Sequence, residues 1–325
     1  STKYYLAENT ELDERKLQKG DILINSTGVG TAGRVTLFEL DGDYVVDSHI
    51  TIFRPNDEVL PTFVLLVLSS VVGFKTLEKM ADGSSGQVEL SIETIKSIKV
   101  PVPPIPVQQE IVDACAKIDE EYNATRMSIE TYRQKIADLF AELDVVMSTD
   151  GGGYKLSLSD TQKFSVAIGK RVLDKELVSN GKIPVYSANV TAPFGFIDKL
   201  LITDFSVPSV LWGIDGDWMT SYLPSDMPFY PTDHCGVLRC KNSEVNPRYL
   251  AHILEVEGRK MGFSRSYRAS IDRVHGIAFT VPDISIQNNA MSKVADYEMA
   301  IKELEGSLEK IASRRSEIIR KALAE

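Results

Sequence analysis

The second half of this 325-residue sequence repeats the first half in order and in spacing. Residues 47–54 and 232–239 each carry a histidine and an arginine that are five positions apart. Further matches follow in residues 58–61 with 244–247, 91–103 with 270–282, and 105–108 with 284–287. Matches that keep one order and a near-constant offset indicate a tandem duplication. We therefore expect two copies of one domain, and this limits the folds open to the chain.

A heptad pattern follows each copy. Mostly apolar residues recur at alternating steps of four and three, which is the spacing of a helix that pairs with another helix. In the first pattern they are Ile111, Cys115, Ile118, Tyr122, Thr125, Ile129, Tyr132, Ile136, Leu139, Leu143 and Val146. In the second they are Ala290, Val294, Tyr297, Ile301, Leu304, Leu308, Ile311, Ile318 and Ala322, with Arg315 in the one polar slot. At 1.5 Å per residue, the first helix would be roughly 50 Å long.

The segment before each long helix has the pattern of a β-sheet with short helices. Residues 21–25 and 210–213 are apolar and strand-like, and residues 34–40 and 44–54 alternate as strands do. Pro61 and Pro247 each open a helix, and a further short helix is expected near residues 91–98. The predicted fold class is α+β, with two homologous domains that each consist of a twisted sheet with short helices.

We place the first domain at residues 1–106, its long helix at 107–149, the second domain at 150–285 and its long helix at 286–325. Pro208 aligns with Gly20, and the second domain has roughly 35 more residues than the first before that point. We expect the first domain to be N-terminally incomplete, so the chain is either a fragment or a truncated copy.

Composition and charge narrow the class of protein. The hydrophobic content of 43% is ordinary for a globular protein, and no apolar run reaches the ~20 residues that span a bilayer. The three cysteines form no even disulfide framework, so we expect a reducing, cytoplasmic setting. The net charge of −10 argues against coating nucleic acid over the whole surface. A local basic stretch nevertheless lies between Glu257 and His275, where five arginines and lysines face two acids.

Three motifs suggest chemistry. Residues 28–33 match G-x-G-x-x-G, but a strand pattern follows where a dinucleotide site needs a helix, so we interpret a tight loop. His49 and His234, beside Asp47 and Asp233, could be catalytic bases or metal ligands; histidines hydrogen-bonded within their own sheet are the favoured interpretation. Trp212 and Trp218 could contact a ligand or belong to the core.

The basic residues 262–268 align with the polar residues 83–87, so one loop has a hydrogen-bonding character in both copies. Arginine binds phosphates or guanine, and serine and glutamine can contact base edges. A solvated surface loop is the alternative.

The order of short motifs resembles the specificity subunit of type I restriction-modification enzymes. The motifs are residues 19–23, residues 83–87 with Leu90, residues 98–105, residues 108–111, residues 183–186 and residues 195–197. This resemblance covers nearly the whole chain. It departs from the family pattern in the shortened first domain and in Gln287-Asn288-Asn289, which is a weaker match than Gln108-Gln109.

The resemblance implies that each globule is a target recognition domain for one half of a split double-stranded DNA site. The two long helices would form an antiparallel coiled coil that sets the spacing of the domains. Methyltransferase subunits and a restriction-translocase subunit would be the partners and would supply the catalysis and bind S-adenosylmethionine. We expect no catalytic residue, cofactor or metal in this chain. The predicted DNA-binding residues are Arg34, Ser84, Ser85, Gln87, Lys260, Arg265, Tyr267, Arg268 and Arg273.

Three other interpretations stay open at this point. The chain could be the recognition part of a fused single-chain restriction-methylation enzyme. It could be a coiled-coil interaction adaptor without a role on DNA. It could also be an enzyme that uses His49 and His234.

Overall fold

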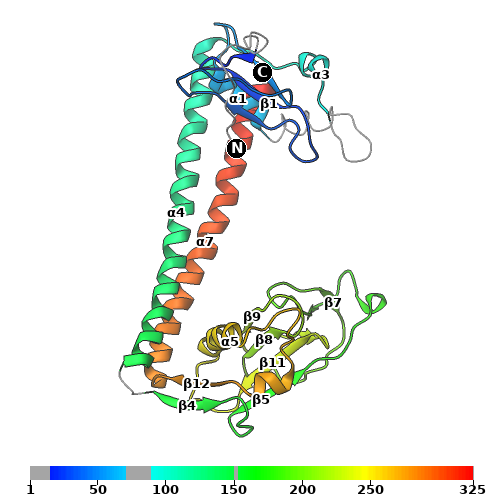
Figure 1. Cartoon of the computed structure of the whole chain (residues 1–325), viewed down its shortest axis with the longest axis vertical. Coiled ribbons are helices and arrows are strands. Elements are labelled where there is room, and N and C mark those ends of the chain that lie inside the picture. Colours follow the sequence, from blue (N-terminus) through cyan, green and yellow to red (C-terminus); the bar gives the residue numbers. More distant parts are fainter. Residues whose placement is uncertain (1–14, 71–88, 150–152, 325) are drawn as a thin grey trace. The chain divides into compact units, whose positions relative to one another are not determined.

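A computed structural model describes residues 15–70, 89–149 and 153–324 (Figure 1). The chain forms two compact units. Unit 1 comprises residues 1–130 and 302–325, and unit 2 comprises residues 131–301. Each unit therefore contains one globular domain together with one part of each long helix.

Unit 1 contains a three-stranded antiparallel sheet in the order β2-β1-β3. Its elements are β1 (Ile22–Asn25), β2 (Val35–Leu37), β3 (Ile50–Phe53), α1 (Pro61–Ser69) and α3 (Ile92–Lys96). Pro61 stands in the first turn of α1, where its missing N–H costs nothing. Ser91 caps α3 by accepting a hydrogen bond from the Thr94 amide at 3.1 Å. Apolar residues of β1 and α1, together with Leu90, form the core of this domain.

Unit 2 is built around a four-stranded antiparallel sheet in the order β5-β11-β8-β9. A second sheet has the order β10-β6-β7, and β12 pairs with β4. The strands are β4 (Tyr154–Ser157), β5 (Phe164–Ile168), β6 (Ile183–Tyr186), β7 (Gly195–Ile197), β8 (Ser209–Gly213), β9 (Thr220–Leu223), β10 (Tyr230–Pro231), β11 (Cys235–Cys240) and β12 (Ala278–Val281). The helices are the 3-10 turn η2 (Asp174–Glu176), α5 (Pro247–Met261) and α6 (Ile271–His275).

The strand registers confirm that the two domains are copies of one fold. Ile22 pairs with Phe53 and Ile24 pairs with Thr51 between β1 and β3. The corresponding pairs between β8 and β11 are Val210 with Leu238 and Trp212 with Gly236. Strands β1, β2 and β3 thus correspond residue by residue to β8, β9 and β11, and the helices α1 and α3 correspond to α5 and α6.

A buried glutamine joins each domain to its long helix in the same way. Gln108 accepts a hydrogen bond from the Leu60 amide at 2.8 Å and donates to the carbonyls of Glu58 and Pro103 at 2.9 and 2.7 Å. Gln287 makes the matching contacts with Asn246, Glu244 and Pro282 at 2.9, 3.2 and 2.8 Å; the full contact set is therefore repeated. Both glutamines are completely buried, so these bonds satisfy groups that water cannot reach.

The long helices are α4 (Ile105–Thr149) and α7 (Ile284–Ala324), and they pair antiparallel as the resemblance implied. In unit 1, Cys115 packs with Ile319, and Asp119 forms an ion pair with Arg315 at 2.7 Å. In unit 2, the rings of Tyr132 and Tyr297 lie 5.5 Å apart. The predicted heptad residues for which burial is described are all buried or half-buried, so the seam is confirmed.

Two details of the sequence prediction are refined. The strand expected over residues 44–54 is short, since only Ile50–Phe53 extends; before it, Asp47 accepts a hydrogen bond from the His49 amide in a tight turn. The glycine motif at residues 28–33 joins antiparallel β1 to β2 and opens no helix, which agrees with the tight-loop interpretation. Within the described part of the chain, every helix is too polar or too short to cross a membrane.

Candidate nucleic-acid interface

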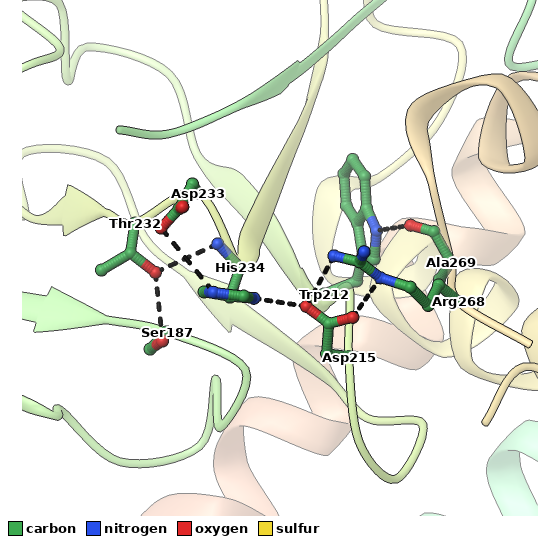
Figure 2. A network of polar contacts seen from close by, with 8 residues as sticks. All are labelled: Ser187, Trp212, Asp215, Thr232, Asp233, His234, Arg268 and Ala269. Atoms are coloured by element: carbon green, nitrogen blue, oxygen red, sulfur yellow. Dashed lines mark hydrogen bonds and ion pairs between the residues drawn. The ribbon is translucent and has the colours of Figure 1, made fainter. Parts of the chain in front are cut away.

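Three charged or polar side chains of unit 2 meet at one end of β8 and β11, the two inner strands of its main sheet (Figure 2). Asp215 follows β8, His234 precedes β11 and Arg268 lies between α5 and α6. The Asp215 carboxylate is hydrogen-bonded with His234 Nδ1. It also forms an ion pair with Arg268 through Nε and accepts a hydrogen bond from Arg268 Nη2 at 2.9 Å. Asp215 is therefore the centre of this cluster.

The fold of the surrounding strands places these side chains. The buried Trp212 in β8 donates from Nε1 to the Ala269 carbonyl at 2.9 Å, and the Ala269 amide donates to the Ile214 carbonyl at 3.1 Å. These bonds hold the backbone beside Arg268 against the end of β8. On the other side, Thr232 accepts from the His234 amide at 3.2 Å. The cluster is thus fixed by backbone contacts rather than by its side chains alone.

The electrostatics of the cluster keep its carboxylate ionised. Partial burial raises the pKa of the Asp215 carboxyl, but the hydrogen bonds from His234 and Arg268 outweigh it and lower the pKa below its ordinary value. The Arg268 and His234 side chains are 57% and 47% exposed. A fixed arginine therefore faces solvent with donors to spare.

An aromatic cluster supports the neighbouring basic loop. Tyr267 stacks on Phe263 with ring centroids 5.8 Å apart, and the Arg273 guanidinium lies 4.0 Å from the Tyr267 ring centroid. Arg273 also donates to the Arg268 carbonyl at 2.7 Å. Backbone hydrogen bonds between Ser264 and Tyr267 close a tight turn that carries Arg265 at its tip. Three of the predicted residues, Tyr267, Arg268 and Arg273, are thereby brought together.

Comparison with known proteins decides the family. The family model for the type I restriction modification DNA specificity domain matches residues 3–130 and 161–312, which is most of the chain. The chain belongs to this family.

Relatives of the chain are specificity subunits. It is 29% identical over 144 residues to a Mycoplasma pneumoniae protein named as the type I specificity subunit S.MpnORF507P, covering 42% of this chain and 38% of the relative. It is 33% identical over 92 residues to the N-terminus of S.MpnORF289P from the same organism, covering 28% of this chain and 49% of the relative. The chain thus spans less than half the length of these two relatives.

A solved structure shows the same fold. The type I restriction-modification S subunit from M. genitalium superposes with a TM-score of 0.60 at 17% identity, covering 94% of this chain and 83% of that chain. At this identity the match concerns the fold alone. It agrees with the α+β architecture of two domains and paired long helices described above.

The other predicted DNA-binding residues have different surroundings. Lys260, in the last turn of α5, forms an ion pair with Glu257 at 2.7 Å. Arg34 is exposed just before β2, and Arg265 is exposed as well. Ser84, Ser85 and Gln87 lie outside the described residues.

Sequence reasoning missed Asp215 as the shared partner of Arg268 and His234. The sequence pattern favours a structural role for His234, and it does not indicate a role for Asp215. The ring of His234 pairs through Nδ1 with Asp215, while Asp233 lies 3.9 Å from its Nε2. The signal available in the sequence was that His49 and His234 occupy matched positions in the two copies, which marks the same place beside each sheet.

The equivalent site in unit 1 has the same backbone and different side chains. The Ser26 amide donates to the His49 carbonyl and the Leu90 amide donates to the Ser26 carbonyl, both at 2.8 Å. In unit 2, Ile214, His234 and Ala269 make the same two bonds. Thr27 thus corresponds to Asp215, and Glu89 to Arg268. His49 Nδ1 lies 3.1 Å from Thr27 Oγ1.

The geometry gives no support to a metal centre or a reactive thiol among the described residues. They contain no group of three or more histidine, cysteine or acidic side chains placed to hold a metal ion. Burial raises the pKa of the Cys235 and Cys240 thiols to about 12, so both are protonated at neutral pH. The site is thus suited to hydrogen bonding and charge contacts.

Proposed function

We propose that this chain is the DNA-recognition subunit of a type I restriction-modification system and that each repeat reads one part of a bipartite target. The observation that carries the proposal is the exposed Asp215-His234-Arg268 cluster, placed where the first repeat has Thr27, His49 and Glu89. Two copies of one fold, each with polar side chains at the equivalent place, suit a DNA site made of two specified blocks.

The chemistry of the cluster suits base recognition. A guanidinium held by a carboxylate keeps its remaining donors in a fixed plane, and this plane matches the O6 and N7 acceptors of guanine. Arg265 and Lys260 are exposed nearby in the sequence and suit phosphate contacts, which supply affinity without sequence information. In unit 1, Arg34, Ser84, Ser85 and Gln87 are the proposed counterparts.

Catalysis would come from partner subunits. We place DNA methylation, with its S-adenosylmethionine, in methyltransferase subunits that dock on the exposed faces of α4 and α7. A restriction and translocation subunit would join that core. Because the chain carries a net charge of −10, we expect its affinity for DNA to appear mainly in the assembled complex.

Alanine substitutions in the assembled methyltransferase test the proposal. Arg268→Ala and Arg265→Ala should weaken binding to the target and slow methylation there, because a bidentate arginine-guanine pair contributes about 1–3 kcal/mol of discrimination. Lys241→Ala is the matched control, since Lys241 is exposed beyond the far end of β11 and its side chain donates only to the Thr161 carbonyl among the described residues.

The result that contradicts the proposal is equally clear. If wild-type complex, both arginine variants and the control gave the same footprint and the same methylation, the assignment of this cluster to DNA would be wrong. A complex that bound no DNA at all would contradict the function itself.

A further inference from the structure

The equivalent sites of the two units have the same backbone hydrogen bonds and different charges. Residues 27, 49 and 89 of unit 1 correspond to residues 215, 234 and 268 of unit 2 through matched strand registers and matched backbone hydrogen bonds. The middle residue is a histidine in both. The third residue is Glu89 in one and Arg268 in the other, and both side chains are exposed.

We propose that these equivalent positions form two base-reading triads in which the third residue selects the base, with Arg268 reading guanine and Glu89 reading cytosine. The inference rests on the proposed function and goes beyond it, because it assigns a base to one position in each half of the target. The two halves then differ at equivalent places, and the target is not palindromic there.

Within the second triad, Asp215 is a positioning residue. Its carboxylate contacts Nε and Nη2 of Arg268, which leaves the Nη1 end of the guanidinium with free hydrogens directed away from the pair. A carboxylate that fixes the arginine in this way reduces the conformational freedom lost on binding a base. The His234 ring contacts Asp215 through Nδ1, and its Nε2 lies 3.9 Å from Asp233 Oδ1.

The first triad has the opposite polarity. Thr27 stands at the position of Asp215 but carries no charge, so it does not repel the Glu89 carboxylate. Glu89 is an acceptor, and the exocyclic N4 amino group of cytosine is the donor that acidic side chains accept from in the major groove. A carboxylate near phosphates opposes binding, so Glu89 would add specificity at some expense of affinity.

Base-preference profiles test the inference. The full chain, assembled with its methyltransferase subunits, is offered double-stranded DNA randomised in both blocks of the target, and bound sequences are counted. Arg268→Lys keeps the charge but loses the planar fork, so guanine preference at one position should fall about tenfold or more with little change in salt dependence. Asp215→Asn should lower the same preference by a smaller factor.

Glu89→Gln is the matched variant in the other repeat. A glutamine pairs with adenine rather than cytosine, so preference in the other block should move from cytosine toward adenine, and total affinity should rise. Thermal unfolding of each variant checks that the fold is unchanged, which is expected because both side chains are exposed.

The outcomes separate the inference from the function on which it rests. A sharp wild-type profile that stays unchanged in Arg268→Lys and Glu89→Gln would overturn the triads and leave DNA recognition intact. A wild-type profile with no base preference anywhere would overturn both. Changes confined to one position in the predicted block would support the triads.

Discussion

The two recognition domains keep one backbone and exchange side chains in contacting pairs. Trp212 faces Gly236 across β8 and β11, and Ile24 faces Thr51 at the same register in unit 1. Arg239 donates to Ser209 at 2.8 Å, and the corresponding Arg54 forms a two-point ion pair with Asp21. The third such contact joins Asp215 to Arg268 in unit 2. The large Trp212 thus faces the small Gly236, and Arg54 and Arg268 each face a carboxylate, whereas Arg239 faces a hydroxyl.

The buried glutamines at the start of α4 and α7 are the contrasting case, because they do not differ between the copies. The comparison teaches that contacts which hold a domain to its helix are kept, while contacts inside the sheet and at the end of its inner strands vary together. Substitutions at both kinds of contact test this difference.

The largest effect is expected from removing a buried glutamine. Gln108→Leu removes the partner of one amide and of two carbonyls in a dry environment. Gln287→Leu does the same, except that the Glu244 carbonyl still accepts a hydrogen bond from the Tyr154 hydroxyl. We expect each to lower the free energy of unfolding by about 4 kcal/mol. Urea unfolding measures this loss. The exposed Gln109→Leu is the control and should cost less than about 0.5 kcal/mol. A cost in either repeat as small as that of Gln109→Leu would contradict a shared role.

A residue exchange within the sheet comes next. A Cβ at Gly236 would lie 2.0 Å from the Trp212 ring, so Gly236→Thr should destabilise unit 2 by about 3 kcal/mol. Replacing Trp212 by Ile at the same time rebuilds the pair found in unit 1 and should recover part of the loss. A double-mutant cycle read by urea unfolding measures the coupling. Additive effects would show that the two residues vary independently.

The Asp21-Arg54 pair is predicted to make unit 1 sensitive to acid. Burial raises the pKa of the Asp21 carboxyl, but hydrogen bonds from Arg54 and from the Gln18 amide lower it below its ordinary value. Because the pKa of Asp21 is lower in the folded protein than in the unfolded chain, where it is about 4, the carboxylate stabilises the fold at pH values above about 4. This contribution is lost as the pH falls through the lower pKa of the folded protein.

Asp21→Ser replaces the ion pair by the serine-arginine contact that unit 2 has between Ser209 and Arg239. It should lower the free energy of unfolding by about 1–2 kcal/mol at neutral pH, a modest loss because Arg54 is half exposed and solvent screens its charge. Hydrogen exchange of the β1 amides, corrected for intrinsic rates, should show this cost at pH 7 and a smaller one at pH 3. Exchange of β8 amides is the internal control. A pH-independent difference in β1 would exclude the ion pair as its source.

The smallest effect is expected on the helix pair of unit 1. Arg314 and Glu121 form an exposed ion pair at 3.0 Å, so Arg314→Ala should change stability by less than about 0.5 kcal/mol. Urea unfolding measures this difference, and high salt should remove it by screening the two charges. A loss of 2 kcal/mol or more would show that this pair matters for helix pairing.

Patterns along the sequence predicted the parts of the fold that depend on periodicity. The heptad spacing predicted α4 and α7, and prolines at positions 61 and 247 predicted the starts of α1 and α5. The repeat predicted two copies of one fold, and the matched strand registers show them. Strand length was less predictable, because the turn that shortens β3 depends on one side-chain bond from Asp47.

The candidate site was only half visible in the sequence. Arg265, Arg268 and Arg273 stand in one basic stretch, so composition found them. Asp215 lies 53 positions before Arg268, and only the sheet brings their side chains together. Histidine in both copies marked the place, but its partner differs, with Asp215 in one and Thr27 in the other. No local pattern could have joined these residues.

The most direct measurement is a map of methylated bases in host DNA with and without this chain. If each repeat reads its own block, methylation that requires the chain should fall at sites with two specified blocks separated by a constant number of unspecified base pairs. Methylation that is unchanged without the chain, or that follows one uninterrupted block, would contradict the account.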